Sequence, residues 1–352
     1  MISSRNGHMT AAVLYGREDL KIKRVPIPRI GADELLVQVK VALTCGTDFK
    51  VWKQGAHARM IKPPAIFGHE LAGLVEEAGE AVQDRFPRGM RVVAANSAPC
   101  NECFFCLKGK PNLCEDLVFN NGAYAQYAVI PGRIVRENVM EIPAHLSFED
   151  AALVEPLACV LRGIEETGIR PGDTTVVIGC GPIGLQFIRI LSGRGVRVLA
   201  VGKRASQMKA ARRLGAEEAF DISVVDTPIP VVRNLTHRQF GADSVIEAVG
   251  SQTTWQWAMQ MVRCGGTINL FGGCPRGTKV EFEPAAMHYS EITVKSTFHH
   301  TPHFIREALA TIARGEVSAK DFVTGQIPLS GLPDLFQQMK NRNGQLKVAV
   351  VP

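Results

Sequence analysis

The sequence predicts an α/β protein of two domains, a mostly β domain and a domain built on a doubly wound parallel sheet. The pattern changes along the 352 residues. Short strand-like segments separated by glycine and proline fill residues 10–135, whereas apolar runs alternate with amphipathic helices after about residue 150. These later runs are continuously apolar, which is typical of parallel strands buried on both faces. A glycine-rich turn that begins at Gly179 joins one such run to a helix.

The elements follow in order along the chain. Strand-like segments of the first domain lie at Glu34–Ala42, Leu71–Glu76 and Arg91–Ala95, and a helix is expected over Asp150–Gly168. The second domain is expected to contain helices at Pro182–Arg194 and Ser206–Leu214 and strands at Thr175–Gly179, Val196–Val201, Glu218–Asp221, Ser244–Glu247, Thr267–Phe271 and Ile292–Phe298. A helix over Pro302–Arg314 and short strands after it are expected to return to the first domain.

The composition argues against several classes of protein. The chain is 46% hydrophobic and 21% charged, and no apolar run approaches the roughly 18 residues of a membrane helix. Residues 1–9 have no apolar core, so we expect no secretory signal there, and residues 1–8 are set aside because Met9 is an alternative start. Nine cysteines fit a reducing compartment, so a cytoplasmic protein is expected. The net charge of +6 is spread out, without the basic and aromatic block of a nucleic-acid binder.

Four cysteines, Cys100, Cys103, Cys106 and Cys114, have the ligand spacing of a structural zinc site. Zinc favours four thiolates about 2.3 Å away, and cysteines two residues apart supply them from tight turns. Two disulfides are the simpler alternative, but cysteines at this spacing rarely reach disulfide geometry. An iron–sulfur cluster is a further alternative, although such runs continue with a near fourth cysteine and a proline, which this run lacks.

A dinucleotide-binding turn is predicted at Gly179-Cys-Gly181-Pro182-Ile183-Gly184, because it follows a strand and opens a helix. Gly179 makes the tight turn in this interpretation. Gly181 lets the backbone approach the pyrophosphate, and Gly184 allows close packing of the helix on the strand. The helix N-terminus adds amide donors. A plain strand–helix turn is the alternative.

The cofactor is expected to be NADP(H) rather than NAD(H). The acidic residue that binds the ribose hydroxyls normally lies about twenty positions after the first glycine, and here Gly202 occupies that place. Lys203 and Arg204 follow, so attraction of a 2′-phosphate replaces repulsion. The alternative is that the two cations only begin a solvated helix.

A second group of metal-type residues consists of Cys45, His69, Glu70 and Glu155. Cysteine, histidine and carboxylate can share a tetrahedral zinc and leave one position open for substrate or water. Each residue also has a simpler interpretation, such as a small core cysteine, a buried histidine or a carboxylate at a helix start.

Taken in order, Cys-Gly-Thr-Asp, Gly-His-Glu, the four-cysteine run, Glu-Pro-Leu-Ala and Gly-x-Gly-Pro-Ile-Gly resemble the zinc-dependent medium-chain dehydrogenases. The likeness covers residues 10–352. With a glutamate at position 155, the sequence resembles the sorbitol (polyol) and threonine dehydrogenase branch of this family. The resemblance implies a GroES-like β domain over residues 1–157, to which residues 297–352 return, and a six-stranded Rossmann domain over residues 158–296.

The resemblance also implies roles. Cys45 and His69 are expected to ligate a catalytic zinc, with Glu70 and Glu155 as acidic ligands, one direct and one through water. Asp48 is expected to orient the histidine. Thr47 is expected to accept the alcohol proton.

Lys50 stands where relatives usually have a histidine that completes the proton relay. It is expected either to relay a proton with a depressed pKa or to be a surface or phosphate contact. His299 and His300, with His57, are expected to line a polar substrate pocket, although hinge packing is the alternative.

The expected reaction is hydride transfer between NADP(H) and a secondary alcohol or ketone, polyol or sugar-like, with a threonine-type amino alcohol as the alternative. A non-catalytic cofactor-binding or zinc-ribbon protein is the alternative from another class. We expect two zinc ions per chain, no nucleic-acid or membrane partner, and a homodimer or homotetramer.

Overall fold

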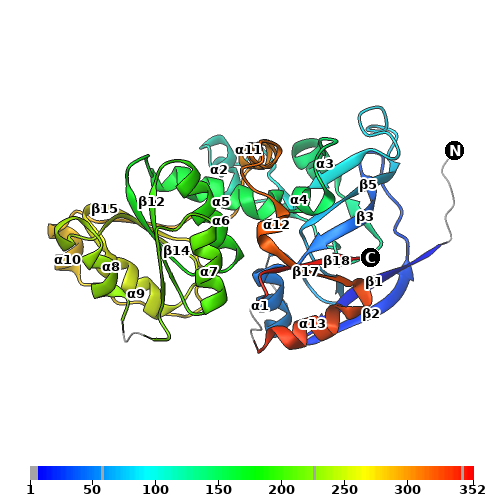
Figure 1. The fold of residues 1–352 in the computed structure, drawn as a ribbon. Helices are drawn as coiled ribbons and strands as arrows, with labels where there is room; N and C mark the ends of the chain where they lie inside the picture. Colours follow the sequence, from blue (N-terminus) through cyan, green and yellow to red (C-terminus); the bar gives the residue numbers. More distant parts are fainter. Residues whose placement is uncertain (1–6, 57–58, 225–226, 342–344) are drawn as a thin grey trace. The chain divides into compact units, whose positions relative to one another are not determined.

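The computed structural model describes residues 7–56, 59–224, 227–341 and 345–352 (Figure 1). The chain divides into two compact units. Unit 1 consists of residues 1–156 and 300–352, and unit 2 of residues 157–299. None of the helices in the described ranges is long and apolar enough to cross a membrane.

Unit 1 is mostly β. Its N-terminal part contains the strands β1 (His8–Gly16), β2 (Asp19–Pro26), β3 (Leu35–Leu43), β4 (Ala65–Ile66), β5 (Leu71–Ala78), β6 (Arg91–Ala94), β7 (Ser97–Ala98), β8 (Val118–Phe119), β9 (Tyr127–Ile130) and β10 (Val139–Glu141). Between them lie α1 (Gly46–Gln54), α2 (Phe104–Leu107), the 3₁₀ helix η1 (Pro111–Leu113), α3 (Gly132–Asn138) and α4 (Phe148–Ala152). The C-terminal part adds α11 (Pro302–Ala313), α12 (Ala319–Phe322), β17 (Val323–Pro328), η3 (Leu329–Gly331), α13 (Leu332–Met339) and β18 (Lys347–Val351).

The two parts of unit 1 share one sheet, in the order β10-β6-β5-β3-β18-β17, with β9 also paired to β3. Strand β18 runs antiparallel to β3, so the red end of the chain lies beside a blue strand in Figure 1. A common core unites them, in which the fully buried Trp52 packs edge-on against Phe336 with ring centroids 5.6 Å apart. The pairing of β18 with β3 brings C-terminal side chains next to β3. Because α1 follows β3 directly, these side chains also lie near the start of α1.

Unit 2 is a doubly wound parallel sheet in the order β13-β12-β11-β14-β15-β16. Its strands are β11 (Thr174–Ile178), β12 (Arg197–Gly202), β13 (Glu218–Asp221), β14 (Ala242–Glu247), β15 (Val262–Leu270) and β16 (Thr293–Lys295). Its helices are α6 (Pro182–Gly193), α7 (Ala205–Arg213), α8 (Ile229–Asn234), η2 (His237–Gln239), α9 (Gln252–Met261) and α10 (Pro284–Tyr289). In Figure 1, α6 and α7 lie on one face of the sheet and α8 and α9 on the other. The predicted fold class is therefore confirmed.

Three predicted elements differ from the structure. The strand expected over Thr267–Phe271 begins earlier, at Val262 of β15. The helix expected over Asp150–Gly168 is interrupted at Leu153, between α4 and α5 (Val154–Thr167). Pro156 has no N–H to donate the hydrogen bond that would continue helix α4. It fits the first turn of α5, because the amides there have no helical partner in any case. The last strand ends at Lys295 rather than Phe298, and Phe298 is followed by a left-handed residue, His299, with φ +69°.

Asp150 fastens the returning C-terminal part to α4. Its carboxylate accepts hydrogen bonds from the Ala319 amide at 2.6 Å, the Ser318 hydroxyl at 3.1 Å and the Ser147 hydroxyl at 2.7 Å. Burial alone would raise the pKa of Asp150, but these hydrogen bonds lower it below its ordinary value. The carboxylate is thus ionised and holds two segments that are far apart in the sequence.

We expect Asp150→Ala to lower the free energy of unfolding by about 2 kcal/mol, because several donors lose a charged acceptor. Urea unfolding at neutral pH measures the loss. Glu149→Ala removes the neighbouring acid and should change stability by less than about 0.5 kcal/mol. Equal losses in the two variants would contradict this role for Asp150.

Candidate functional site

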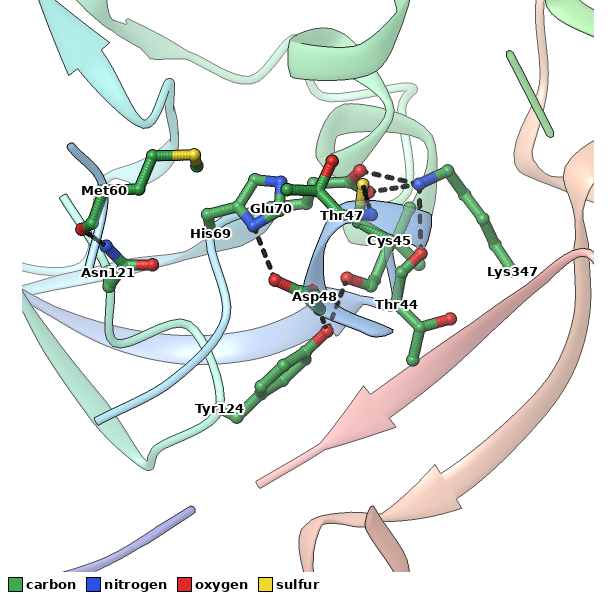
Figure 2. Close-up of polar contacts among 11 residues, drawn as sticks. Thr44, Cys45, Thr47, Asp48, Met60, His69, Glu70, Asn121, Tyr124 and Lys347 are labelled. Carbon is green, nitrogen blue, oxygen red and sulfur yellow. Dashed lines mark hydrogen bonds and ion pairs between the residues drawn. The ribbon is translucent and has the colours of Figure 1, made fainter. Parts of the chain in front are cut away.

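Three metal-type side chains meet in unit 1 beside the C-terminal end of β3. Cys45 begins α1, and its sulfur accepts a hydrogen bond from the Thr47 amide at 3.4 Å. His69 and Glu70 come from the turn that leads into β5 and are buried. The Cys45 sulfur and one donor atom each from His69 and Glu70 all lie within 4.8 Å of one another (Figure 2).

His69 is held by a chain of buried hydrogen bonds. Its Nδ1 lies 2.8 Å from Oδ1 of Asp48, and the Tyr124 hydroxyl donates to Oδ2 of Asp48 at 2.6 Å. Figure 2 shows that the other ring nitrogen of His69 points toward Cys45 and Glu70. Burial acts to lower the pKa of His69, but Asp48 and Cys45 raise it well above its ordinary value. The arrangement fixes which nitrogen is left for a metal.

Glu70 is bound by a buried lysine that the sequence reasoning missed. Lys347 on β18 places its Nζ 2.7 and 2.5 Å from the two carboxylate oxygens of Glu70 and 3.1 Å from the Thr44 carbonyl. Both side chains of the pair are essentially inaccessible. Burial acts to lower the pKa of Lys347, but the Glu70 carboxylate raises it, so the lysine is charged. A lone lysine in the apolar run of residues 346–351 is the signal that could have revealed it.

Glu155 lies in the first turn of α5 and is also buried. Burial raises its pKa to about 7, and the nearby His69 counteracts this only in part. Oε1 of Glu155 is 3.8 Å from Nε2 of His300, which is itself 2.9 Å from the Asn96 side-chain oxygen. Glu155 therefore belongs to the electrostatic surroundings of the cluster formed by Cys45, His69 and Glu70.

The four cysteine sulfurs of the lobe at residues 100–114 all lie within 4.8 Å of one another. The sulfur of Cys100 lies 3.4 Å from that of Cys114 and 3.9 Å from that of Cys106, which is 3.6 Å from the sulfur of Cys103. Thiolates about 2.3 Å from one zinc ion are about 3.8 Å apart, so the set fits zinc. All nine cysteines of the chain are free thiols, which excludes the disulfide alternative.

The glycine-rich turn of unit 2 is shaped for close approach. Gly179 has φ +104°. A Cβ at Gly184 would lie 1.7 Å from the Gly179 carbonyl oxygen, so only glycine lets α6 pack on β11. A Cβ at Gly181 would meet nothing within 4 Å. Open space at this position, before Pro182 and Ile183 begin α6, is what a pyrophosphate requires.

The second part of the expected nucleotide site lies at the end of β12. Gly202 is the last residue of that strand and is buried. Lys203 is exposed, and Arg204 is the half-buried residue that precedes α7. Unit 2 thus brings two cations next to the position from which the usual acid is missing.

Comparisons with known proteins identify the family. Residues 31–144 match the alcohol dehydrogenase GroES-like domain, and residues 182–314 match the zinc-binding dehydrogenase family. Sorbitol dehydrogenase of Bacillus subtilis is 29% identical over 353 residues, which cover 98% of each chain. D-arabinitol dehydrogenase 1 of Uromyces fabae is 30% identical over 98% of this chain and 97% of its own. The chain belongs to the zinc-dependent alcohol dehydrogenase superfamily.

Solved structures agree with this dehydrogenase fold over nearly the whole chain. A putative zinc-binding dehydrogenase from Sinorhizobium meliloti 1021, bound to NADP, is 31% identical with a TM-score of 0.88, covering 98% of this chain and all of its own. Alcohol dehydrogenase TADH from Thermus sp. ATN1 is 29% identical with a TM-score of 0.87, covering 97% and 99%. The predicted family and enzyme class are confirmed, and the alternative of a non-catalytic zinc-ribbon protein falls away.

The remaining expected site residues of the dehydrogenase differ in accessibility. Thr47 is half-buried in the first turn of α1, and Lys50, one turn further on, is exposed. His299 belongs to unit 2, where Arg162 donates to its carbonyl at 2.9 Å, whereas His300 is buried in unit 1. His299 is half-buried and His300 is buried, so the two adjacent histidines differ in accessibility. His57 lies outside the described residues.

The Lys347–Glu70 pair yields a stability prediction for the metal-free dehydrogenase. Lys347→Met should lower the free energy of unfolding by about 3–5 kcal/mol, because it leaves a buried carboxylate without a counter-charge. Adding Glu70→Gln should recover part of that loss. Urea unfolding in the presence of a chelator measures both variants.

Lys340→Met is the matched control. It removes a lysine whose Nζ lies 2.6 Å from Glu18, but this ion pair is partly exposed and should contribute less than about 1 kcal/mol. A loss at Lys347 no larger than that at Lys340 would contradict the importance of burial.

Proposed function

We propose that this dehydrogenase oxidises a secondary alcohol of a polyol or sugar-like substrate with NADP⁺, or reduces the corresponding ketone with NADPH. The observation that carries the proposal is the cluster of Cys45, His69 and Glu70, which offers a thiolate, an imidazole and a carboxylate within 4.8 Å of one another. The relatives named as sorbitol and arabinitol dehydrogenases support the polyol class. A threonine-type amino alcohol is the second candidate, from the sequence pattern around Glu155.

The donor set fits a catalytic zinc with an open position. Cys45, His69 and Glu70 would hold the ion, and the distances favour Glu70 over Glu155 as the direct acidic ligand. Glu155 would then act through water. Bound there, a zinc ion would supply Lewis-acid chemistry that favours ionisation of a substrate hydroxyl.

The protein's own residues orient the ligands and move the proton. Tyr124 and Asp48 hold His69 with its second nitrogen directed to the cluster. Thr47 would accept the hydroxyl proton of the substrate. Lys50 follows it by three residues on α1 and therefore shares a helix face, and its exposure would let the proton reach water.

The four-cysteine lobe would hold a second zinc ion with a structural role. Cys100, Cys103, Cys106 and Cys114 occupy all four positions of a tetrahedral ion, so no position remains for a substrate. Backbone hydrogen bonds, the first from Glu115, lower the pKa of Cys103 to about 6, whereas burial raises the pKa of Cys106 to about 12. Zinc binds the thiolate form of cysteine, so zinc binding would release protons from this lobe. We therefore propose two zinc ions per chain. Separately, from the family resemblance, we propose that the protein assembles as a homodimer or homotetramer.

The preference for NADP(H) rests on the end of β12. Gly202 offers no carboxylate for the ribose hydroxyls, and Lys203 and Arg204 offer two cations to a 2′-phosphate. A similar protein with NADP bound supports the same choice. A single charged hydrogen bond to phosphate contributes about 1.5–3 kcal/mol, enough to decide between the two cofactors.

Cys45→Ser should abolish turnover, lower the zinc content from two ions to one per chain, and leave NADPH binding intact. Zinc is quantified by metal analysis, binding by NADPH fluorescence, and turnover by NADPH absorbance on a panel of polyols, sugars, amino alcohols and their ketones. Cys264→Ser is the control, since it removes an exposed cysteine and should retain both ions. Full activity of a metal-free Cys45→Ser protein would overturn the assignment, and turnover of amino alcohols alone would replace the polyol proposal.

Replacing both Lys203 and Arg204 by alanine should raise KM for NADP at least about tenfold and leave KM for NAD nearly unchanged, because only the 2′-phosphate loses its partners. Steady-state kinetics with each cofactor measure the ratio of kcat/KM. Lys209→Ala removes an exposed cation on the same helix α7 and should not change that ratio. A wild-type enzyme that prefers NAD would refute the proposed preference.

A further inference from the structure

Gly202 is required by space rather than by backbone conformation. Its φ is not among the left-handed values found at other glycines of the described chain. A Cβ built on Gly202 would instead lie 2.3 Å from the terminal methyl carbon of Met208 and 3.2 Å from the sulfur of Cys180. The contact at 2.3 Å is an overlap, so any side chain at this position must displace the end of Met208, whereas the contact at 3.2 Å is tight but does not overlap.

The two neighbours come from elements on either side of the expected nucleotide site. Met208 lies on α7 and is 3% exposed. Cys180 is the middle residue of the glycine-rich turn and is 1% exposed, and its thiol is directed at the Val201 carbonyl at 3.7 Å. A side chain at Gly202 would therefore contact the turn that faces the pyrophosphate.

The backbone around Gly202 cannot easily retreat from these neighbours. The Gly179 amide donates to the Val201 carbonyl at 2.7 Å, and the Ile222 amide donates to the Gly202 carbonyl at 2.8 Å. Strand β12 also pairs with β11 and β13 on its two sides. Room for a side chain must come from Met208, whose unbranched side chain can move, or from a shift of the turn at Cys180.

We propose that Met208 is a determinant of cofactor specificity, because it occupies the space that a ribose-binding carboxylate at position 202 would need. This inference rests on the proposed NADP(H) preference and explains why that preference is fixed by packing as well as by charge. An acid introduced at Gly202 alone would displace Met208 or press on Cys180, and either shift disturbs the binding of both cofactors. Shortening Met208 to alanine removes three heavy atoms and opens the position.

The uncharged variant Gly202→Ala isolates the steric effect. It should lower Tm and weaken the binding of NADPH and NADH by similar factors, at least about threefold, because it adds a Cβ and no charge. Gly202→Ala combined with Met208→Ala should restore Tm and binding toward those of Met208→Ala alone. Thermal unfolding and fluorescence titration give these results without measuring turnover.

The charged variants then test specificity. Gly202→Asp alone should lose affinity for NADPH without gaining affinity for NADH, whereas Gly202→Asp with Met208→Ala should bind NADH at least about tenfold more tightly than the wild type. An unchanged Tm and cofactor affinity in Gly202→Ala, or a full switch to NADH by Gly202→Asp alone, would overturn the role of Met208. The wild-type ratio of the two affinities tests the proposed preference separately, so the two ideas can fail independently.

Discussion

The buried ion pair between Lys347 and Glu70 is the interaction on which unit 1 depends. Its partners are 277 residues apart, and both are removed from water. Such a pair is stable only where its geometry is close and its remaining donors are used, and here Lys347 also donates to the Thr44 carbonyl. Because Thr44 directly precedes Cys45, the same lysine links the C-terminal strand, the acidic side chain and the segment that carries the thiol. Correct pairing of β18 with β3 is therefore a condition for assembling the candidate metal site.

The ionisable groups around this pair explain why the cluster is suited to a divalent cation. Cys45, Asp48, Glu70 and Glu155 are the acidic side chains here, and Lys347 and His69 are the basic side chains beside them. Burial raises the pKa of Glu155 to about 7, because removal from water disfavours the charged carboxylate. A nearby positive charge would favour that carboxylate. A zinc ion would provide it, while Tyr124 and Asp48 keep His69 in the orientation that binds a metal.

The sequence was sufficient to predict those elements whose structure depends on residues close together in the chain. The strands of unit 2 are within a few residues of their predicted positions because each is a short apolar run bounded by turn residues, and the glycine motif has the expected conformation because its contacts lie within one strand–turn–helix segment. The four cysteines of the lobe also lie close together in the sequence, so their clustering could be predicted from spacing alone. Lys347 was missed because its role depends on a partner brought close only by the return of the C-terminus. His299 and His300 are sequence neighbours, yet His299 has a left-handed backbone and is half-buried whereas His300 is buried, which no periodicity predicts.

The glycines of the nucleotide site show how one residue type can satisfy three separate requirements. Gly179 adopts a positive φ, Gly184 lets α6 approach the turn closely, and Gly181 faces open space that would suit the proposed cofactor. Gly202, like Gly184, is a position where a side chain would collide with its neighbours. Its place in the sequence indicates only that the usual acidic residue is absent. The same glycine that removes the charge also lets Met208 and Cys180 pack against the strand. On the proposed role of Met208, an acidic side chain at position 202 would need a smaller side chain at position 208 to make room for it.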